Sequence, residues 1–137
     1  MIPRYRAWIS EADTMTNDLK GIDFENETVV LKKIYWEDGF PAETEVFEVE
    51  IGNAILMRST GLFDRNGKEI FEGDILACET DDEVINVNVF WDEGHALFMF
   101  ESKKYNEQEP LAELVENNTY PFEIIGNIYE NKELLDA

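Results

Sequence analysis

The sequence predicts a mainly β protein of antiparallel strands, with a β-rich α+β fold as the alternative. About seven short segments rich in Val, Ile and aromatic residues recur along the chain, and turn residues separate them. Short strands at such spacing are typical of antiparallel barrels and sandwiches. We therefore expect a single domain over residues 1–137: an antiparallel N-terminal lobe at about 1–59, a small SH3-like barrel at about 60–137, and one or two short helices.

The N-terminal lobe contains three predicted strands. Residues 5–9 and 28–36 are rich in branched and aromatic side chains, which favour strands. Residues 44–51 alternate, with Phe47 and Val49 on one face against Glu48 on the other, so we expect a half-buried strand. Between them, residues 10–14 form a polar turn, residues 15–24 are irregular with at most a short strand at 21–24, and residues 37–41 form a break.

Residues 60–78 predict the hairpin around which the chain is organised. Apolar pairs at 62–63 and 70–71 flank a turn at residues 64–68, in which Asn66 and Gly67 tolerate a positive φ. Residues 75–78 are four apolar residues in a row, which indicates a strand buried on both faces.

The C-terminal part adds a second hairpin and a closing strand. Residues 84–91 and 96–101 form the hairpin, and the polar residues 102–109 are expected to be mobile. Pro110 precedes a short helix at 111–116. Residues 122–129 form the last strand, in which Gly126 indicates a bulge or a close backbone approach, and Asn131 is placed to cap a turn at 132–135.

Three blocks of sequence carry a resemblance to a known family. They are Tyr5-Arg6-Ala7-Trp8, the segment TGLFDRNGKEIFEGDI at residues 60–75, and GNIYEN at 126–131 followed by Glu133-Leu134-Leu135. The chain resembles the YopX-type proteins of bacterial phages and prophages, although Lys132 stands where that family's closing block has Pro. The resemblance implies a phage or prophage setting and oligomerisation, and it brings no catalytic residues.

The charge of the chain is strongly negative. The 11 basic and 31 acidic residues give −20; residues 1–59 carry −6 and residues 60–137 carry −14. Such a charge repels phosphate backbones and anionic lipids, so we expect no direct binding to nucleic acid or membrane. It favours a basic protein partner, imitation of nucleic acid, or solubility alone.

One cysteine, Cys78, excludes an internal disulfide and fits a reducing compartment. No signal peptide and no run of ~18 apolar residues is present. We therefore expect the cytoplasm of a bacterial host.

Two acidic segments are candidates for a metal site. Asp64, Asn66 and Gly67 begin like a calcium loop, but Glu69 and Ile75 stand where that loop needs its Gly and its bidentate Glu. Residues 81–83 place three carboxylates in a row, yet adjacent acids in a loop are usually solvated. We predict no metal ligand and no cofactor.

The sequence does not favour an enzyme, because it contains no recognisable combination of catalytic residues. Cys78 and His95 are the one thiol and the one imidazole, but Cys78 is expected to be buried and His95 to lie in a polar turn. Ser10, Ser59 and Ser102 have no nucleophile motif around them. We predict no catalytic residue.

The aromatic residues are candidates for a surface on which bases or a peptide would stack. Most lie in predicted strands, where packing in the core is the default, and few Lys or Arg accompany them. A peptide-binding groove is kept as an alternative. The residues are Trp8, Trp36, Trp91, Tyr5, Tyr35, Tyr105, Tyr120 and Tyr129.

The leading hypothesis is a phage-encoded acidic binding or assembly module that acts by protein–protein contact and forms homo-oligomers, with a basic host or phage protein as a further partner. One alternative is a nucleic-acid charge mimic that inhibits a host DNA-binding protein. The other is a metal-dependent enzyme that uses exposed carboxylates.

Overall fold

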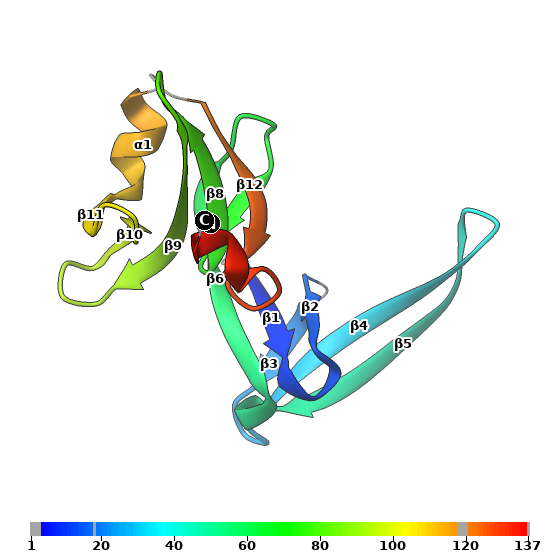
Figure 1. Cartoon of the computed structure of the whole chain (residues 1–137). Helices are drawn as coiled ribbons and strands as arrows, with labels where there is room; N and C mark the ends of the chain where they lie inside the picture. The colour runs from blue at the N-terminus through cyan, green and yellow to red at the C-terminus, as the bar shows by residue number, and fades with distance from the viewer. Residues whose placement is uncertain (1–3, 18, 118–120, 137) are drawn as a thin grey trace. The chain divides into compact units, whose positions relative to one another are not determined.

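The computed structural model describes residues 4–17, 19–117 and 121–136. Strands account for 61% of the structure, and the described residues contain one α-helix (Figure 1). The predicted mainly β, antiparallel fold is confirmed. The chain divides into two compact units, Met1–Met57 and Arg58–Ala137, and strand β6 (Ala54–Phe63) runs from the first into the second.

Two antiparallel sheets build the first unit. In one, β1 pairs with β2, and the sheet continues from β1 to β6. In the other, β4 lies between β3 and β5. The elements are β1 (Tyr5–Ile9), η1 (Ser10–Ala12), β2 (Thr14–Thr16), β3 (Leu19–Asp23), β4 (Thr28–Glu37), β5 (Phe40–Glu50) and η2 (Ile51–Asn53).

The core of the first unit comes from alternate residues of its strands. Val29 and Leu31 lie on one face of β4 because strand side chains alternate, and both are buried. Ala7, Ile9 and Ala54 complete this buried cluster. Beyond Leu31, the side chains of β4 are half-buried or exposed, so the core ends there.

The break predicted at residues 37–41 is present but shorter than predicted, since it consists of Asp38 and Gly39 alone. β4 reaches Glu37, β5 begins at Phe40, and Asp38 and Gly39 close the hairpin with φ of 51° and 83°. Pro41 is tolerated inside β5 because β5 is an edge strand. On an edge strand, a residue without an N–H can face solvent and need not donate a hydrogen bond to the sheet.

The strand predicted at residues 44–51 is confirmed as far as Glu50, but the half-buried face predicted for it is wrong. Val49 alone is half-buried, whereas Phe47 and Ile51 are exposed.

The second unit begins with the predicted hairpin. β6 returns as β7 (Glu69–Phe71), with Phe63 opposite Glu69. Oδ1 of Asp64 accepts the backbone N–H groups of Asn66 and Lys68, both at 2.9 Å, and Gly67 has a φ of 76°. The turn predicted at residues 64–68 is confirmed.

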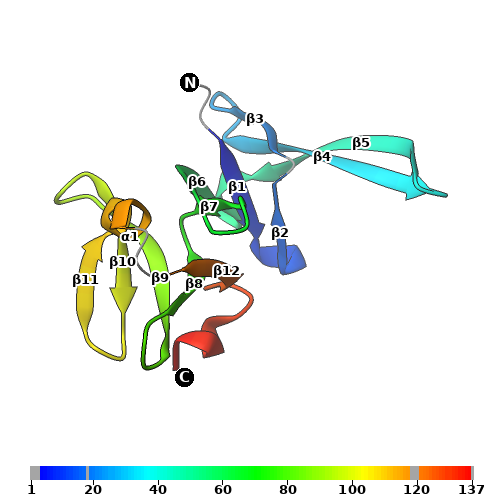
Figure 2. The same cartoon turned by 90° about the horizontal axis from the view of Figure 1, so that it is seen from above.

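A five-stranded antiparallel sheet forms most of the second unit, in the order β11-β10-β9-β8-β12, and it curls as half of a barrel (Figure 2). The elements are β8 (Asp74–Glu79), β9 (Val84–Asp92), β10 (Leu97–Ser102), β11 (Glu107–Pro110), α1 (Leu111–Asn117), β12 (Phe122–Asn127) and η3 (Lys132–Asp136). Within the described part of the chain, no helix has the length and apolarity needed to cross a bilayer.

One face of this sheet carries the core of the second unit. Directly opposed residues share a face, so the pairs Leu76 with Val87 and Cys78 with Ile85 lie on the same side. Leu111 of α1 is fully buried against this cluster. The burial of Ile75, Leu76 and Cys78 confirms that the apolar run at 75–78 is a strand covered on both faces.

Two short strands escaped the sequence patterns. Residues 14–16 form β2 against β1, where a turn ending at residue 14 and then an irregular segment are predicted. Residues 107–110 form β11 against β10, within the segment expected to be mobile. Glu and Gln are weak strand formers, so β11 depends on main-chain pairing with β10, which side-chain patterns do not reveal.

The closing motif confirms the close approach predicted at Gly126. A Cβ on Gly126 would lie 2.5 Å from Oδ1 of Asn131, so a larger residue has no room. That oxygen accepts the backbone N–H of Asn127 at 3.2 Å, and Oδ1 of Asn127 in turn accepts the N–H of Glu130 at 2.9 Å. Two asparagine side chains thereby fix the turn after β12.

Candidate functional site

The Asp64 carboxylate is occupied by the backbone. Besides its two bonds within the turn, its Oδ2 accepts the N–H of Ile124 at 3.0 Å. Burial alone would raise its pKa, but the three N–H donors from Ile124, Lys68 and Asn66 outweigh burial and lower the pKa below 3.8. These contacts support the turn interpretation over a calcium loop.

The acidic residues 81–83 lie in the loop between β8 and β9. Glu83 binds Nζ of Lys104 and the hydroxyl of Tyr105, each at 2.7 Å, and the hydrogen bond from Lys104 is the main cause of its lowered pKa. Asp81 and Asp82 are exposed. Over residues 4–17, 19–117 and 121–136, no group of three or more His, Cys, Asp or Glu side chains is arranged to hold a metal ion.

Cys78 and His95 lie far apart. Cys78 is opposite Ile85 at the start of β9, whereas Nδ1 of His95 lies 2.8 Å from Oδ2 of Asp92 at the other end of that strand. Seven residues of extended chain separate Ile85 from Asp92, which is roughly 23 Å. The thiol is buried, and burial raises its pKa to about 11. The geometry brings no thiol and imidazole together.

The serines have structural surroundings. Ser59 donates a hydrogen bond to Glu69, and Oγ of Ser102 accepts the N–H of Tyr105 at 3.3 Å. Ser10 is exposed in η1.

The aromatic side chains do not gather into one stacking surface. Trp91 packs edge-on against Phe98, with the Arg58 guanidinium 4.5 Å from the Trp91 ring centroid. Trp8, Tyr5 and Tyr129 are half-buried. Tyr120 lies outside the described residues.

The strongest unexplained surface is the outer part of the β4–β5 hairpin. β3 pairs with β4 only as far as Leu31, opposite Leu19. From Lys32 to Val46, each strand pairs with the other alone among the residues that the structure describes, and Figure 1 shows this two-stranded ribbon continuing past the end of β3. We call residues 32–46 the arm.

Large apolar side chains are exposed along the arm. On one face, Tyr35 is 40% exposed and its hydroxyl donates to Glu45 at 2.9 Å. The other face carries Trp36 and Val46, which are 65% and 49% exposed, and Phe40 beside the tip is 74% exposed. Both faces of the ribbon therefore present apolar surface.

Sequence reasoning missed the arm because its residues read as ordinary strands. The alternation at residues 44–51 predicts one covered face, but periodicity does not say whether a core is present to cover it. A signal was available in Trp36 and Phe40, which flank the hairpin tip, where core packing is sparse.

Comparison with solved structures finds several matches, two of which cover nearly the whole chain. A crystal structure of protein EF1440 from Enterococcus faecalis has a TM-score of 0.65 and 27% identity, covering 98% of this chain and 99% of that one. The crystal structure of protein yopX from Bacillus subtilis has a TM-score of 0.61 and 24% identity, covering 96% of each chain. No curated protein matches the chain.

The family model described as YopX protein matches residues 4–136. That span contains the opening block, the central hairpin and the closing asparagine motif on which the resemblance was based. The chain belongs to the YopX protein family.

Proposed function

We propose that this protein is a phage-encoded assembly module that works by protein–protein contact without catalysis, in the cytoplasm of a bacterial host. Its first partner is a second copy of the same chain, and the contact is made by the arm. The exposed apolar residues on both faces of a two-stranded ribbon are the observation that carries this proposal.

An isolated two-stranded ribbon is marginally stable in water, so a protein gains little from projecting one without a partner. Burial of exposed aromatic side chains is a strong source of binding energy, and Trp and Tyr are enriched at binding hot spots. Trp36, Phe40 and Tyr35 supply such residues within a short stretch. A partner that covers the arm would stabilise it and bury these rings.

The charge of the arm favours a second copy. It carries Lys32 and Lys33 together with Glu37, Asp38, Glu43 and Glu45, so basic and acidic groups lie side by side. A two-fold contact places the same patch on both subunits, and a patch with both signs can be complementary to itself. Residues 60–137 carry a net charge of −14, so this part of one subunit would repel the same part of another.

Sedimentation velocity of the native chain and of the double variant Trp36→Ser with Phe40→Ser tests the proposal. The native chain is expected to sediment as an oligomer and the double variant as a monomer with an unchanged circular dichroism spectrum. Phe24→Ser is the matched control, because Phe24 is 84% exposed in the turn before β4 and outside the arm. A native monomer, or an oligomer that survives the double variant, would refute the role of the arm.

The concentration of negative charge supports a second candidate, imitation of nucleic acid. Nineteen acidic residues lie within residues 60–137. A mimic would capture basic DNA-handling proteins in a salt-dependent way, because long-range charge attraction is screened by salt. Retention of such proteins by a Trp36→Ser/Phe40→Ser monomer at low salt, with release at moderate salt, would favour this second function.

A further inference from the structure

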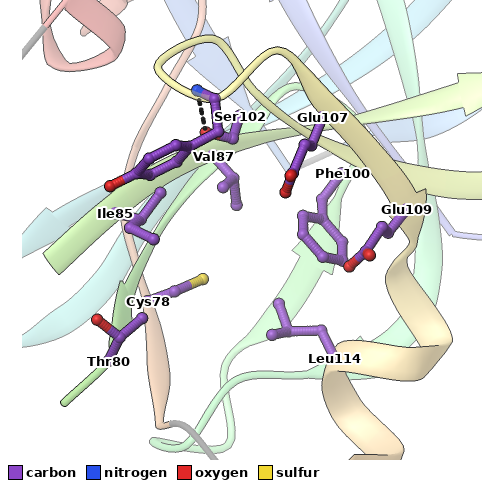
Figure 3. A pocket seen from close by; sticks show the side chains of 10 residues that line it. Cys78, Thr80, Ile85, Val87, Phe100, Ser102, Glu107, Glu109 and Leu114 are labelled. Carbon is purple, nitrogen blue, oxygen red and sulfur yellow. Dashed lines mark hydrogen bonds between the residues drawn. The ribbon is translucent and has the colours of Figure 1, made fainter. Parts of the chain in front are cut away.

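The second unit contains a cavity of about 300 Å³ between the core face of its sheet, β11 and α1 (Figure 3). This volume lies at the lower end of the range for small-molecule sites in proteins. Ile85 and Val87 of β9, Phe100 of β10 and Leu114 of α1 form apolar walls. The cavity does not involve the arm, so it is independent of the proposed assembly contact.

The strand register explains why these side chains meet. Val89 lies opposite Phe100 on the core face, and on the next strand Phe100 lies opposite Glu109. Ser102 lies opposite Glu107 in the same way. The apolar face of the sheet therefore ends, at its outermost strand, in two carboxylates two residues apart.

Glu107 and Glu109 differ from the other polar groups of the cavity. The Thr80 hydroxyl donates to the backbone oxygen of Glu83 at 2.9 Å, and the Ser102 oxygen accepts from the backbone of Tyr105. Both Glu107 and Glu109 are exposed, and neither carboxylate has a hydrogen-bond or ion-pair partner among the residues that the structure describes. Figure 3 shows the Glu107 carboxylate directed into the space that the apolar side chains surround.

The basic side chain nearest in sequence does not neutralise this pair of carboxylates. Nζ of Lys104 lies 2.7 Å from a carboxylate oxygen of Glu83, so Lys104 forms its ion pair with the β8–β9 loop. Residues 60–137 carry a net charge of −14. This charge repels anions from the cavity entrance and attracts cations to it. An aromatic wall adds to this preference, because a cation over a ring such as Phe100 is attracted by its π face.

We propose that this cavity binds a small organic cation, an amine with an apolar body. The apolar part packs between Phe100 and Leu114, and the ammonium group pairs with Glu107 and Glu109. Charged residues that point inward on an edge strand also protect it from pairing with other strands. That role needs no ligand, and a titration distinguishes the two.

Isothermal titration calorimetry with phenethylammonium, and with 2-phenylethanol and phenylacetate as neutral and anionic counterparts, tests the proposal. Phenethylammonium is expected to bind at least tenfold more tightly than the alcohol, and phenylacetate is expected not to bind. The variant Glu107→Gln with Glu109→Gln should lose at least tenfold in affinity for the amine while its affinity for the alcohol stays the same.

Glu113→Gln with Glu116→Gln is the matched control, since both side chains are exposed on α1 and the change in net charge is identical. This control should bind the amine as the native chain does. Equal losses in the two double variants would mean that overall charge alone attracts the amine. Equal affinity for amine and alcohol, or no binding of either, would refute the site.

Discussion

Oδ2 of Asp64 accepts the backbone N–H of Ile124 at 3.0 Å, although 60 residues separate them. Beside this bond, the N–H of Arg65 donates to the oxygen of Phe122 at 3.2 Å. The turn at residues 64–68 therefore occupies backbone groups of β12, the outer strand of the five-stranded sheet. Covering an edge in this way prevents it from pairing with another chain.

Replacing Asp64 by Ala should lower the free energy of unfolding by about 2–3 kcal/mol at pH 7, because buried N–H donors lose a charged acceptor. The effect should depend on pH. The folded-state pKa of Asp64 lies below its ordinary 3.8, so its contribution is present above about pH 4 and is lost as pH falls through the folded value. Urea unfolding of both proteins between pH 7 and pH 3 measures this difference.

Asp81→Ala is the control for that series. Asp81 is exposed in the β8–β9 loop, and its replacement removes the same charge as Asp64→Ala. It should change the free energy of unfolding little at any pH. A loss for Asp64→Ala that is the same at pH 7 and pH 3 would contradict the assigned bonds.

Replacing Gly126 by Ala should destabilise the second unit by about 1–3 kcal/mol, because the added Cβ overlaps the side chain of Asn131. Asn131→Gly removes the atoms that clash. In that background, Gly126→Ala should lower the free energy of unfolding by much less, and the two substitutions should be clearly non-additive. Thermal unfolding of the four proteins in this cycle measures the coupling; additive effects would show that the clash is relieved elsewhere.

Sequence patterns succeeded where local chemistry decides the structure. Asn66 and Gly67 predict their turn, and the apolar run at 75–78 predicts a buried strand, since both depend on neighbours in the chain. β11 was missed because its pairing partner, and not its own side chains, makes it a strand.

The candidate surfaces are harder to predict from sequence for a related reason. Phe47 reads as a core residue and is exposed, because the number of strands beside β5 is a property of the whole sheet. Glu107 and Glu109 read as part of a polar connection, and only the register with Phe100 and Ser102 places them at a cavity.

Cys78 should react slowly with a bulky disulfide reagent in the native protein. Burial raises the pKa of its thiol to about 11 from 9.0, which reduces the thiolate fraction at pH 8 by about a hundredfold, and steric exclusion slows the reaction further. Absorbance on release of the reagent's thiolate measures the rate with and without denaturant. Asp81→Cys in a Cys78→Ala background supplies an exposed thiol for comparison, and native labelling at that exposed rate would place Cys78 at the surface.

Association through the arm should respond to salt in a definite direction. Two subunits of charge −20 repel each other, whereas burial of Trp36 and Phe40 removes apolar surface from water. Salt screens the repulsion and leaves the apolar term nearly unchanged, so the oligomer should hold constant or tighten from low to moderate salt. Sedimentation velocity across a salt series measures this. Dissociation on adding salt would mean that ion pairs hold the subunits together in place of the aromatic side chains. Lys32 and Lys33 could form such pairs with acidic residues of the other subunit.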